Sequence, residues 1–558
     1  MWRRLVIFAF VFLIAFGFAT KFPRNETLYI GGGIWAPPSN WNPFVPWNAV
    51  DGTVGMIYET LFFYDPLTGK LQPWLAESGK WTDSKTFVVK LREGTNWQDG
   101  KPLTSEDVKF TFEIANKYKA FYYSGVWDWL DSIETPDDRT IIFHFSQPRY
   151  HNWLITMYTV PIVPKHIWDG KTQDEIFSTA NKNPVGSGMY KAEEWDQDKM
   201  VFLRNENWWG IKYFGKPAPK RVVHIKIFSN NVALGMILKG ELDWSGFFLP
   251  GIPRLVQAYG GLVTWYKHPP YMLSDNVAYL FMNTKKAPMN SALFRRAVAF
   301  AINVNEIVDK VFEKQVKKAR PSGYLPIPAW DRFYNKELDE EYGFHYNPIK
   351  AAKLLDEAGI VDKDGDGWRD LPSGKPFKLE IIVPYGWTDW MESIKIIAKN
   401  LNAVGINAEP KFPDFGKYWE DITKGKFDMA INNFGSQVSM TPWTLYNYVV
   451  HYPITDAMYD GNFGRYDNEE LFNLLEEINK TPLSEEDKLK DLFSKAQKVL
   501  LTEMPAVPLW YNGLWFQANS SHWTNWPTEK NPYAYPCLWA GRWQVGGLKV
   551  LLNLRPAK

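Results

Sequence analysis

An acidic loop in the second half of the chain has the donor spacing of a calcium site. Oxygen donors occupy alternate positions of this loop, from the first to the ninth, at Asp362, Asp364, Asp366, Trp368 and Asp370. Gly367 stands at the sixth position, where calcium loops turn sharply, but Ser373 stands at the twelfth, where a bidentate glutamate is usual. The loop is therefore either a structural Ca²⁺ site or an Asp/Gly-rich connector between two elements.

Aromatic side chains are the second group that could carry a function, since the 558 residues include 28 Trp, 28 Tyr and 36 Phe. Most aromatic rings pack in cores, but Trp is seldom fully buried and suits surfaces that join an apolar face to a polar edge. Sugar rings stack their C–H faces on indole, while their hydroxyls need fixed hydrogen-bond partners. The composition therefore allows a sugar-binding surface.

The sequence offers no motif for catalysis. A secreted glycoside hydrolase would also combine a Trp-lined cleft with two carboxylates, and it stays as an alternative of another class. Some pair among 62 acidic residues always looks plausible, so a recognisable motif is needed, and we find none. A nucleophile elbow and a His-Glu-x-x-His motif are also absent from the sequence. We expect a binding protein and no enzyme, with no required cofactor.

Residues 1–19 have the three parts of a signal peptide. Two arginines precede the apolar stretch Leu5–Phe18, and Gly17 and Ala19 supply small residues before a cut after residue 19. A retained N-terminal anchor is the alternative, because the apolar stretch is long for a signal peptide. No cysteine near the cut offers a site for a lipid. We therefore expect a freely soluble periplasmic protein with no lipid anchor.

The balance of charges and the hydrophobic pattern of the sequence exclude further classes of protein. The 63 basic and 62 acidic residues leave no basic stripe for nucleic acid, and the single Cys537 cannot form an internal disulfide. Thr104 or Ser105 is expected to cap a helix. Strands are expected near 199–204, 221–228, 378–383 and 428–432, and helices near 231–239, 292–310, 348–358, 391–404, 468–478 and 484–502. This is an α/β pattern.

Several phrases along the mature chain resemble the oligopeptide/nickel/oligosaccharide-binding receptors of ABC transporters, solute-binding family 5. Two of them are Trp97-Gln98-Asp99-Gly100-Lys101-Pro102 and Phe294-Arg295-Arg296-Ala297, and the others fall at 76–94, 184–190, 279–284, 350–359 and 505–509. The resemblance implies a two-lobed α/β periplasmic-binding-protein fold of type II that closes around its ligand. It also implies ABC importer membrane subunits as partners. We expect a monomer.

The same resemblance suggests where the lobes begin and end. Lobe I would contain residues 20–270 and 501–558, with an inserted α+β subdomain at about 60–185, and lobe II would contain residues 271–500. The two crossings fall near Pro269-Pro270 and Pro505–Pro508, where the pattern of elements also breaks.

The absence of an acidic residue at one place suggests which class of ligand the protein binds. Peptide-binding relatives carry an aspartate after a strand of the second lobe, where it pairs with the ammonium group of the peptide. The corresponding window, 432–443, contains no carboxylate but has Asn432, Asn433 and Gln437. An ammonium group buried without a counter-charge would cost several kcal/mol. The chain is therefore most similar to the members that bind cello- or manno-oligosaccharides, and an oligopeptide receptor of the same fold is the alternative.

Candidate residues for ligand contact are the aromatic and amide side chains of loops that would face the cleft. Each ring could instead pack between elements. The candidates are Trp35, Asn40, Trp41, Trp244, Trp387, Asn432, Asn433, Gln437, Trp443 and Trp510.

Overall fold

The computed structural model describes residues 22–32, 38–45, 51–433, 438–538 and 543–558. The predicted signal peptide therefore lies outside the described residues. Among the helices of the described part, none is both long enough and apolar enough to cross a membrane.

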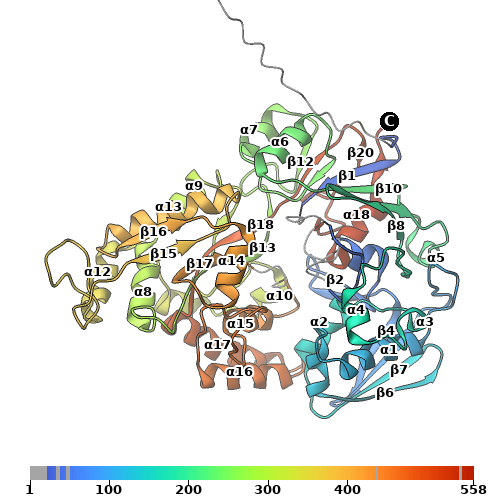
Figure 1. Ribbon diagram of the computed structural model, residues 1–558, viewed down its shortest axis with the longest axis horizontal. Coiled ribbons are helices and arrows are strands. Elements are labelled where there is room, and N and C mark those ends of the chain that lie inside the picture. Colours follow the sequence, from blue (N-terminus) through green and yellow to red (C-terminus); the bar gives the residue numbers. More distant parts are fainter. Residues whose placement is uncertain (1–21, 33–37, 46–50, 434–437, 539–542) are drawn as a thin grey trace, which may run out of the picture.

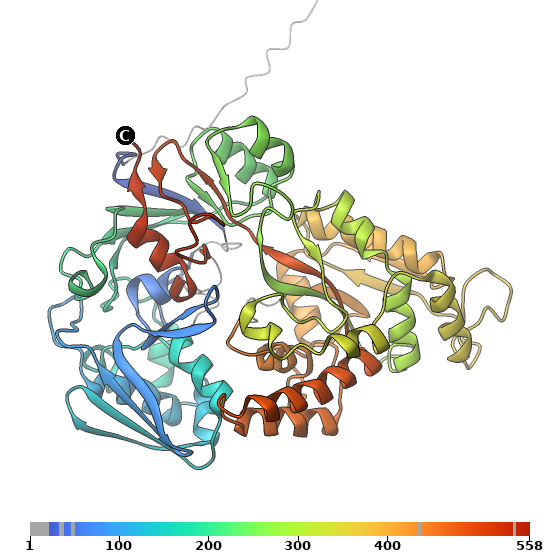
Figure 2. The same cartoon turned by 180° about the vertical axis from the view of Figure 1, so that it is seen from behind.

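Two large sheets, one in each half of the molecule, organise the chain (Figures 1 and 2). The strand order in the first is β12-β19-β11-β1-β10-β9-β8 and in the second β14-β18-β13-β17-β15-β16. We call the half that holds the first sheet the first lobe, and the other half the second lobe. The strands of the first sheet are β1 (Thr27–Gly31), β8 (Tyr190–Trp195), β9 (Lys199–Arg204), β10 (Arg221–Ile225), β11 (Trp244–Ser245), β12 (Leu262–Thr264) and β19 (Gln517–Asn519). Those of the second are β13 (Leu273–Met282), β14 (Lys317–Lys318), β15 (Leu379–Ile382), β16 (Ala408–Lys411), β17 (Met429–Asn432) and β18 (Ala506–Leu514).

A smaller four-stranded sheet, ordered β4-β5-β7-β6, belongs to the first lobe and falls within the range predicted for the inserted subdomain. Helices α1 and α2 pack against it, and together they bury Phe112, Phe143 and Trp153. The elements of this region are β2 (Phe62–Asp65), β3 (Lys70–Pro73), β4 (Ala76–Asp83), β5 (Thr86–Leu91), α1 (Ser105–Lys117), β6 (Leu130–Asp137), β7 (Thr140–Phe145), α2 (Tyr150–Thr159), α3 (Lys165–Trp168) and α4 (Gln173–Ser178).

Helices cover both faces of the second sheet. One core joins the sheet to α8, α12 and α13, and another joins it to α14, α15, α16 and α17. The helices of the second lobe are α8 (Ala292–Ala301), α9 (Val304–Lys310), α10 (Pro328–Asp331), α11 (Lys336–Tyr342), α12 (Pro348–Glu357), α13 (Thr388–Asn402), α14 (Phe415–Thr423), α15 (Trp443–Val450), α16 (Glu469–Lys480) and α17 (Glu486–Glu503). The first lobe adds α5 (Ile211–Phe214), α6 (Asn230–Leu238), α7 (Ile252–Ala258), α18 (Gly547–Asn553), β20 (Trp523–Thr524) and β21 (Arg555–Pro556).

The chain passes between the two sheets twice, in the short segments 265–272 and 515–516. The strands that follow the first passage and precede the second, β13 and β18, are antiparallel neighbours paired from Leu273↔Leu514 to Phe281↔Ala506. The second sheet thus continues through β18, beyond the boundary predicted at residue 500. The two segments that join the lobes therefore leave from the same end of one pair of hydrogen-bonded strands.

Local sequence signals explain where several helices begin. Thr104 is the cap residue of α1, and its backbone N–H donates to the Asp107 carboxylate over 2.9 Å, which is the reciprocal bond of a capping box. The helical spacing at 292–310, however, is divided between α8 and α9. The reason is Asn303, whose side-chain oxygen accepts from the N–H of Glu306 over 3.2 Å and so begins a new helix.

A buried carboxylate ties together distant parts of the first lobe. Glu59 is fully buried, and its Oε1 accepts from the indole N–H groups of Trp74 and Trp208 at 2.9 and 3.0 Å. Its Oε2 accepts from the indole of Trp209 at 2.8 Å. Burial raises the pKa of Glu59 to about 7, although these donors oppose the shift. Three bulky rings are thereby held around one acceptor.

The raised pKa of Glu59 predicts a pH-dependent contribution to stability. The folded state binds the proton of this carboxyl up to about pH 7, whereas the unfolded chain loses it near pH 4.5. The contribution is therefore present below pH 4.5 and is lost as the pH rises through 7, by about 3 kcal/mol. Chemical unfolding of the wild type and of Glu59→Gln from pH 4.5 to 8 measures it. The difference in unfolding free energy should fall with pH, and a constant difference would contradict the assignment.

Candidate functional site at the junction of the lobes

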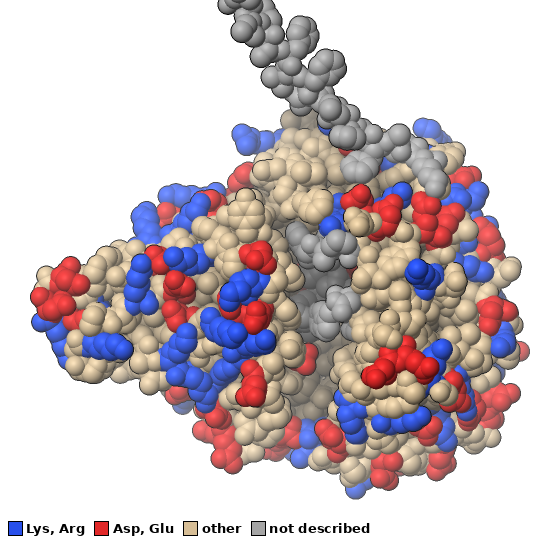
Figure 3. All heavy atoms as spheres, in the orientation of Figure 1, with Lys and Arg blue, Asp and Glu red and all other residues tan. Residues whose placement is uncertain are grey.

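The carboxyl ends of parallel strands from both lobes face each other. In the first sheet β1 runs parallel to β10 and β11, and in the second β15 runs parallel to β16 and β17. Asn230, just after β10, donates from Nδ2 to the hydroxyl of Thr388, just after β15, over 3.1 Å. Figure 3 shows a groove between the two lobes on this face. Ligands of open α/β sheets bind at such carboxyl edges, so this junction is the candidate site.

Polar side-chain atoms without partners gather on the second-lobe side of the junction. Asn276 and Asn512 are opposed residues of β13 and β18, and the Oδ1 atoms of both are buried with no hydrogen-bond partner among the described residues. Nδ2 of Asn432, the last residue of β17, is also buried with no hydrogen-bond partner among the described residues. Buried polar groups are normally paired, so each of these amides is a candidate contact for a bound molecule.

The first-lobe side offers a similar set. Four atoms here are buried and have no hydrogen-bond partner in the described part of the chain. They are the indole nitrogens of Trp244 and Trp543 and the Oε1 atoms of Gln517 and Gln544. The rings of Trp244 and Trp543 lie 5.9 Å apart in an edge-to-face arrangement, and Gln517 is paired with Ser245, the residue after Trp244. Both donors and acceptors are thus present on the two sides, and none of them carries a formal charge.

The structure places the predicted contact residues in different surroundings. Trp35 and Gln437 lie outside the described residues. Trp41 is buried against Phe202, with ring centroids 5.1 Å apart. Asn40 is 8% exposed, and its side-chain oxygen accepts from the N–H of Asn42 over 2.9 Å. These two residues therefore hold the first-lobe loop that follows β1.

The remaining predicted residues divide between the core and the edge of the second lobe. Trp510 is fully buried 4.9 Å from the ring of Phe312, and Trp244 is buried in the aromatic cluster already described. Trp443 is 8% exposed and donates from its indole to the carbonyl of Leu475. Trp387 and Asn433 are partly exposed. In this arrangement Trp387 has the most accessible ring of the predicted aromatic contacts that the structure describes, and contact with ligand stays a prediction for all of them.

Sequence reasoning missed Asn276, Gln517, Trp543 and Gln544. For Asn276 a signal was present, because three successive polar residues, Ser274, Asp275 and Asn276, interrupt an otherwise apolar strand. The glutamines and Trp543 stand in segments without a recognisable pattern, and only the tertiary fold brings them to the junction.

A second contact between the lobes lies far from the crossing strands, where α2 of the inserted region meets α16 (Figures 1 and 2). Arg149 forms an ion pair with Glu476, and both side chains are largely buried. The Asn152 backbone N–H donates to Asn479 Oδ1 over 3.1 Å, and Asn479 Nδ2 donates back to Asn152 Oδ1 over 3.0 Å. We call these two pairs of residues the polar clasp. It connects the lobes independently of the crossing strands.

His151 of α2 makes a further contact with the second lobe, next to the polar clasp. Its Nδ1 lies 2.7 Å from Oγ1 of Thr441, in the segment that precedes α15. Burial lowers the pKa of His151 to about 4, so the ring is neutral at neutral pH. This contact brings the second-lobe window 438–443 against α2.

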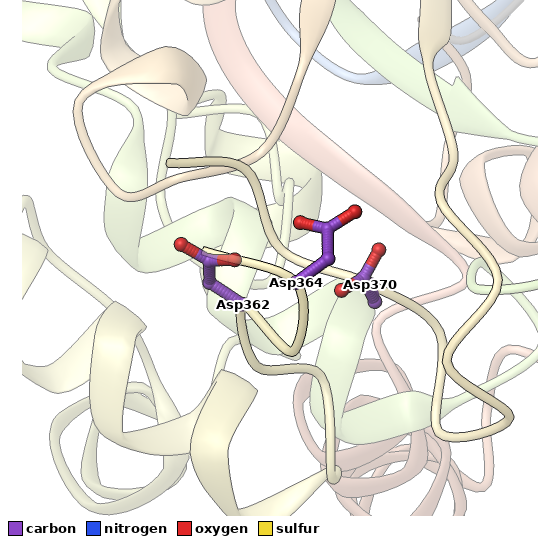
Figure 4. Close-up of side chains that lie close together, drawn as sticks. All are labelled: Asp362, Asp364 and Asp370. Atoms are coloured by element: carbon purple, nitrogen blue, oxygen red, sulfur yellow. The ribbon is translucent and has the colours of Figure 1, made fainter. Parts of the chain in front are cut away.

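The acidic loop brings three of its five predicted donors together (Figure 4). Carboxylate oxygens of Asp362, Asp364 and Asp370 lie within 4.8 Å of one another, whereas Asp366 accepts from the N–H of Trp368 over 2.7 Å. Both oxygens of Asp362 accept backbone N–H groups, from Gly365 at 2.7 Å and Gly367 at 3.0 Å. Gly367 has φ +90°, a conformation that favours glycine. These three aspartates are the residues that could hold a cation.

Comparison with known proteins agrees with this architecture. Residues 70–456 match the bacterial extracellular solute-binding proteins, family 5 Middle. A periplasmic oligopeptide-binding protein of an oligopeptide ABC transporter from Thermotoga maritima is 53% identical, with a TM-score of 0.92 over 96% of this chain and 100% of that one. Its structure with bound mannohexaose gives a TM-score of 0.91. The oligopeptide-binding protein AppA of Bacillus subtilis is 26% identical over 377 residues, 66% of each chain. The predicted two-lobed α/β fold is confirmed.

The polar clasp predicts that the lobes separate when it is removed. Arg149→Ala leaves Glu476 half-buried without its cation, which should disfavour the closed arrangement by about 1 to 2 kcal/mol. Small-angle scattering, or distances between spin labels on the two lobes, should report a wider ligand-free molecule. Arg139→Ala is the matched control, since Arg139 pairs with Glu77 within the first lobe. Equal dimensions for the wild type and both variants would contradict the role of the clasp.

Proposed function

Because the chain belongs to family 5 of the bacterial extracellular solute-binding proteins, we propose that it captures a neutral, β-linked oligosaccharide of the cello- or manno-oligosaccharide type for an ABC importer. Members of this family are binding receptors and not enzymes. The lobes close around the sugar, and the closed form is delivered as a monomer to the membrane subunits. The signal peptide proposed at residues 1–19 exports the chain to the periplasm.

The observation that carries the proposal is that the buried amide and indole atoms named above have no partner among the described residues and carry no formal charge. Asn276, Asn432 and Asn512 on one side and Gln517 and Gln544 on the other are neutral. Sugar hydroxyls both donate and accept, so they match a mixed set of amide and indole atoms without bringing a charge into a buried space. The protein from Thermotoga maritima that is 53% identical has been crystallised with mannohexaose, which supports a sugar as the cargo.

An oligopeptide remains the competing cargo, because several relatives are named for oligopeptide binding. A peptide ammonium group would need a carboxylate that is not already engaged. The nearest buried acid on the crossing strands is Asp275, whose oxygens accept from Tyr535 Oη at 2.9 Å and Asn276 Nδ2 at 2.7 Å. The described part of the window 432–443 contains no acidic residue. On the crossing strands and in this window, a buried ammonium group would thus be poorly compensated.

Titration with a panel of β-linked di- to hexasaccharides and a panel of di- to nonapeptides tests the cargo. Sugars should saturate the protein and change its Trp fluorescence, because closure moves indoles out of water. Asn512→Ala should lower sugar affinity about tenfold, the usual effect of losing one buried hydrogen bond. Asn116→Ala, on the exposed surface of α1, should leave affinity unchanged. Saturation by peptides alone would refute the sugar assignment.

We also propose that the loop 362–370 binds a structural Ca²⁺ ion through Asp362, Asp364 and Asp370. The convergence of these three carboxylates supports the proposal, and the loop joins α12 to β15, far from the junction of the lobes (Figure 1). The ion would offset the mutual repulsion of the carboxylates and would not touch the sugar.

Calcium binding predicts a thermal shift without an effect on ligand affinity. Chelator should lower the melting temperature of the wild type by a few degrees, and added Ca²⁺ should restore it, since an ion bound only to the folded state stabilises that state. In Asp364→Asn the shift should be lost. An identical melting temperature with chelator and with Ca²⁺ would leave the loop as a connector.

A further inference from the structure

Five aromatic side chains form a row outside the junction of the lobes. Phe228 and Tyr385 are 68% and 72% exposed, and they belong to opposite lobes. The backbones that carry them are close, since a Cβ atom placed on Gly386 would lie 3.9 Å from the Phe228 carbonyl oxygen. Trp387, Phe415 and Trp419 continue the row on the second lobe. We call these five residues the aromatic shelf.

The second-lobe part of the shelf is continuous. The Tyr385 N–H donates to the carbonyl of Pro413 over 2.8 Å, which places the loop after β15 beside the loop after β16. The rings of Trp387 and Phe415 are 6.0 Å apart and inclined by 30°, and those of Phe415 and Trp419 are 6.5 Å apart and inclined by 10°. Phe415 is itself 42% exposed. Successive, nearly parallel rings therefore extend from the carboxyl edge of the sheet along α14.

The polar groups near the shelf are mostly neutral or already engaged. Asn230 and Thr388 bridge the lobes beside it. Asp414 caps α14 by accepting from the N–H of Lys417, and the Lys417 ammonium group pairs with Asp421. Lys226 lies over the Phe228 ring, 4.5 Å from its centroid. The shelf therefore offers aromatic rings beside hydrogen-bonding side chains, a combination that suits a sugar chain.

An exposed row of aromatic side chains indicates a binding surface. Single exposed apolar residues are common, but contiguous aromatic surface on a water-soluble part of a chain marks a binding surface. The shelf is continuous with the groove between the lobes, since its members follow the carboxyl ends of β10, β15 and β16. A neutral oligosaccharide too long to fit inside the junction would contact these rings where it emerges from the groove.

We infer that the aromatic shelf is an accessory glycan subsite that holds the protruding end of a long oligosaccharide outside the closed junction. This inference rests on the proposed function. Phe228 comes from the first lobe and the other four rings from the second, so a sugar on the shelf contacts both lobes only when they are closed. The shelf thus adds affinity in proportion to chain length and favours closure.

Isothermal titration of a β-linked series from disaccharide to hexasaccharide tests the subsite. The wild type should bind the longest members more tightly than the shortest. Phe228→Ala/Tyr385→Ala should lower affinity for the longest members about tenfold, the loss expected for two stacking rings, and should leave the disaccharide unchanged. The control is Tyr122→Ala/Tyr346→Ala, which removes from each lobe one surface ring outside the shelf, 45% and 42% exposed. Both double variants should melt as the wild type does, because the removed rings are exposed.

The outcomes separate this inference from the proposed function. If the wild type binds no sugar of any length, the proposed function fails. If it binds sugars but affinity does not rise with length, or if the shelf variant keeps the whole rise, the subsite is refuted. An equal loss at every length would also refute it, because that result would place these rings within the enclosed site.

Discussion

The hydrogen-bonded pair β13–β18 is the constraint on which the rest of the structure depends. Both passages of the chain between the lobes begin at the same end of this pair, at Leu273 and Leu514. Because the pair is also central in the second sheet, the lobes are fixed to each other at one place and have freedom only in the short segments beyond it. The same two strands carry Asn276 and Asn512, so the hinge itself presents polar groups to the candidate site.

Contacts between the lobes beyond this pair are partly apolar, since Phe248 of the first lobe packs against Phe312 of the second with ring centroids 5.6 Å apart, and partly polar. Asn230 meets Thr388 near the carboxyl edges, and the polar clasp of α2 and α16 closes the distant side. Such contacts exchange readily with water, because hydrogen bonds of this sort contribute only about 1 kcal/mol each. The arrangement suits a receptor that must bind its cargo and later release it.

Two buried carboxylates of the first lobe are fully hydrogen-bonded. Glu59 receives three indole donors, and Asp243 accepts from both Arg24 and the backbone of Tyr29. Those carboxylates are fully engaged and organise the interior. The unpaired amides and indoles at the junction differ from them in that neighbouring side chains leave their hydrogen-bonding capacity unused. Their position near the facing carboxyl edges of the two sheets is the physical ground for placing the ligand there.

The sequence by itself determined the family, the α/β class and most helices and strands, because caps such as Thr104 and apolar periodicity act over a few residues. It also indicated the acidic loop, since ligand spacing within one loop is local. It did not determine which tryptophans are accessible: Trp244 and Trp510 are buried, while Trp387 keeps an open face. Nor did it bring Gln517 and Gln544 to Trp244, or Phe228 to Tyr385. These relations join residues far apart in the chain, and only the packing of one lobe against the other decides them.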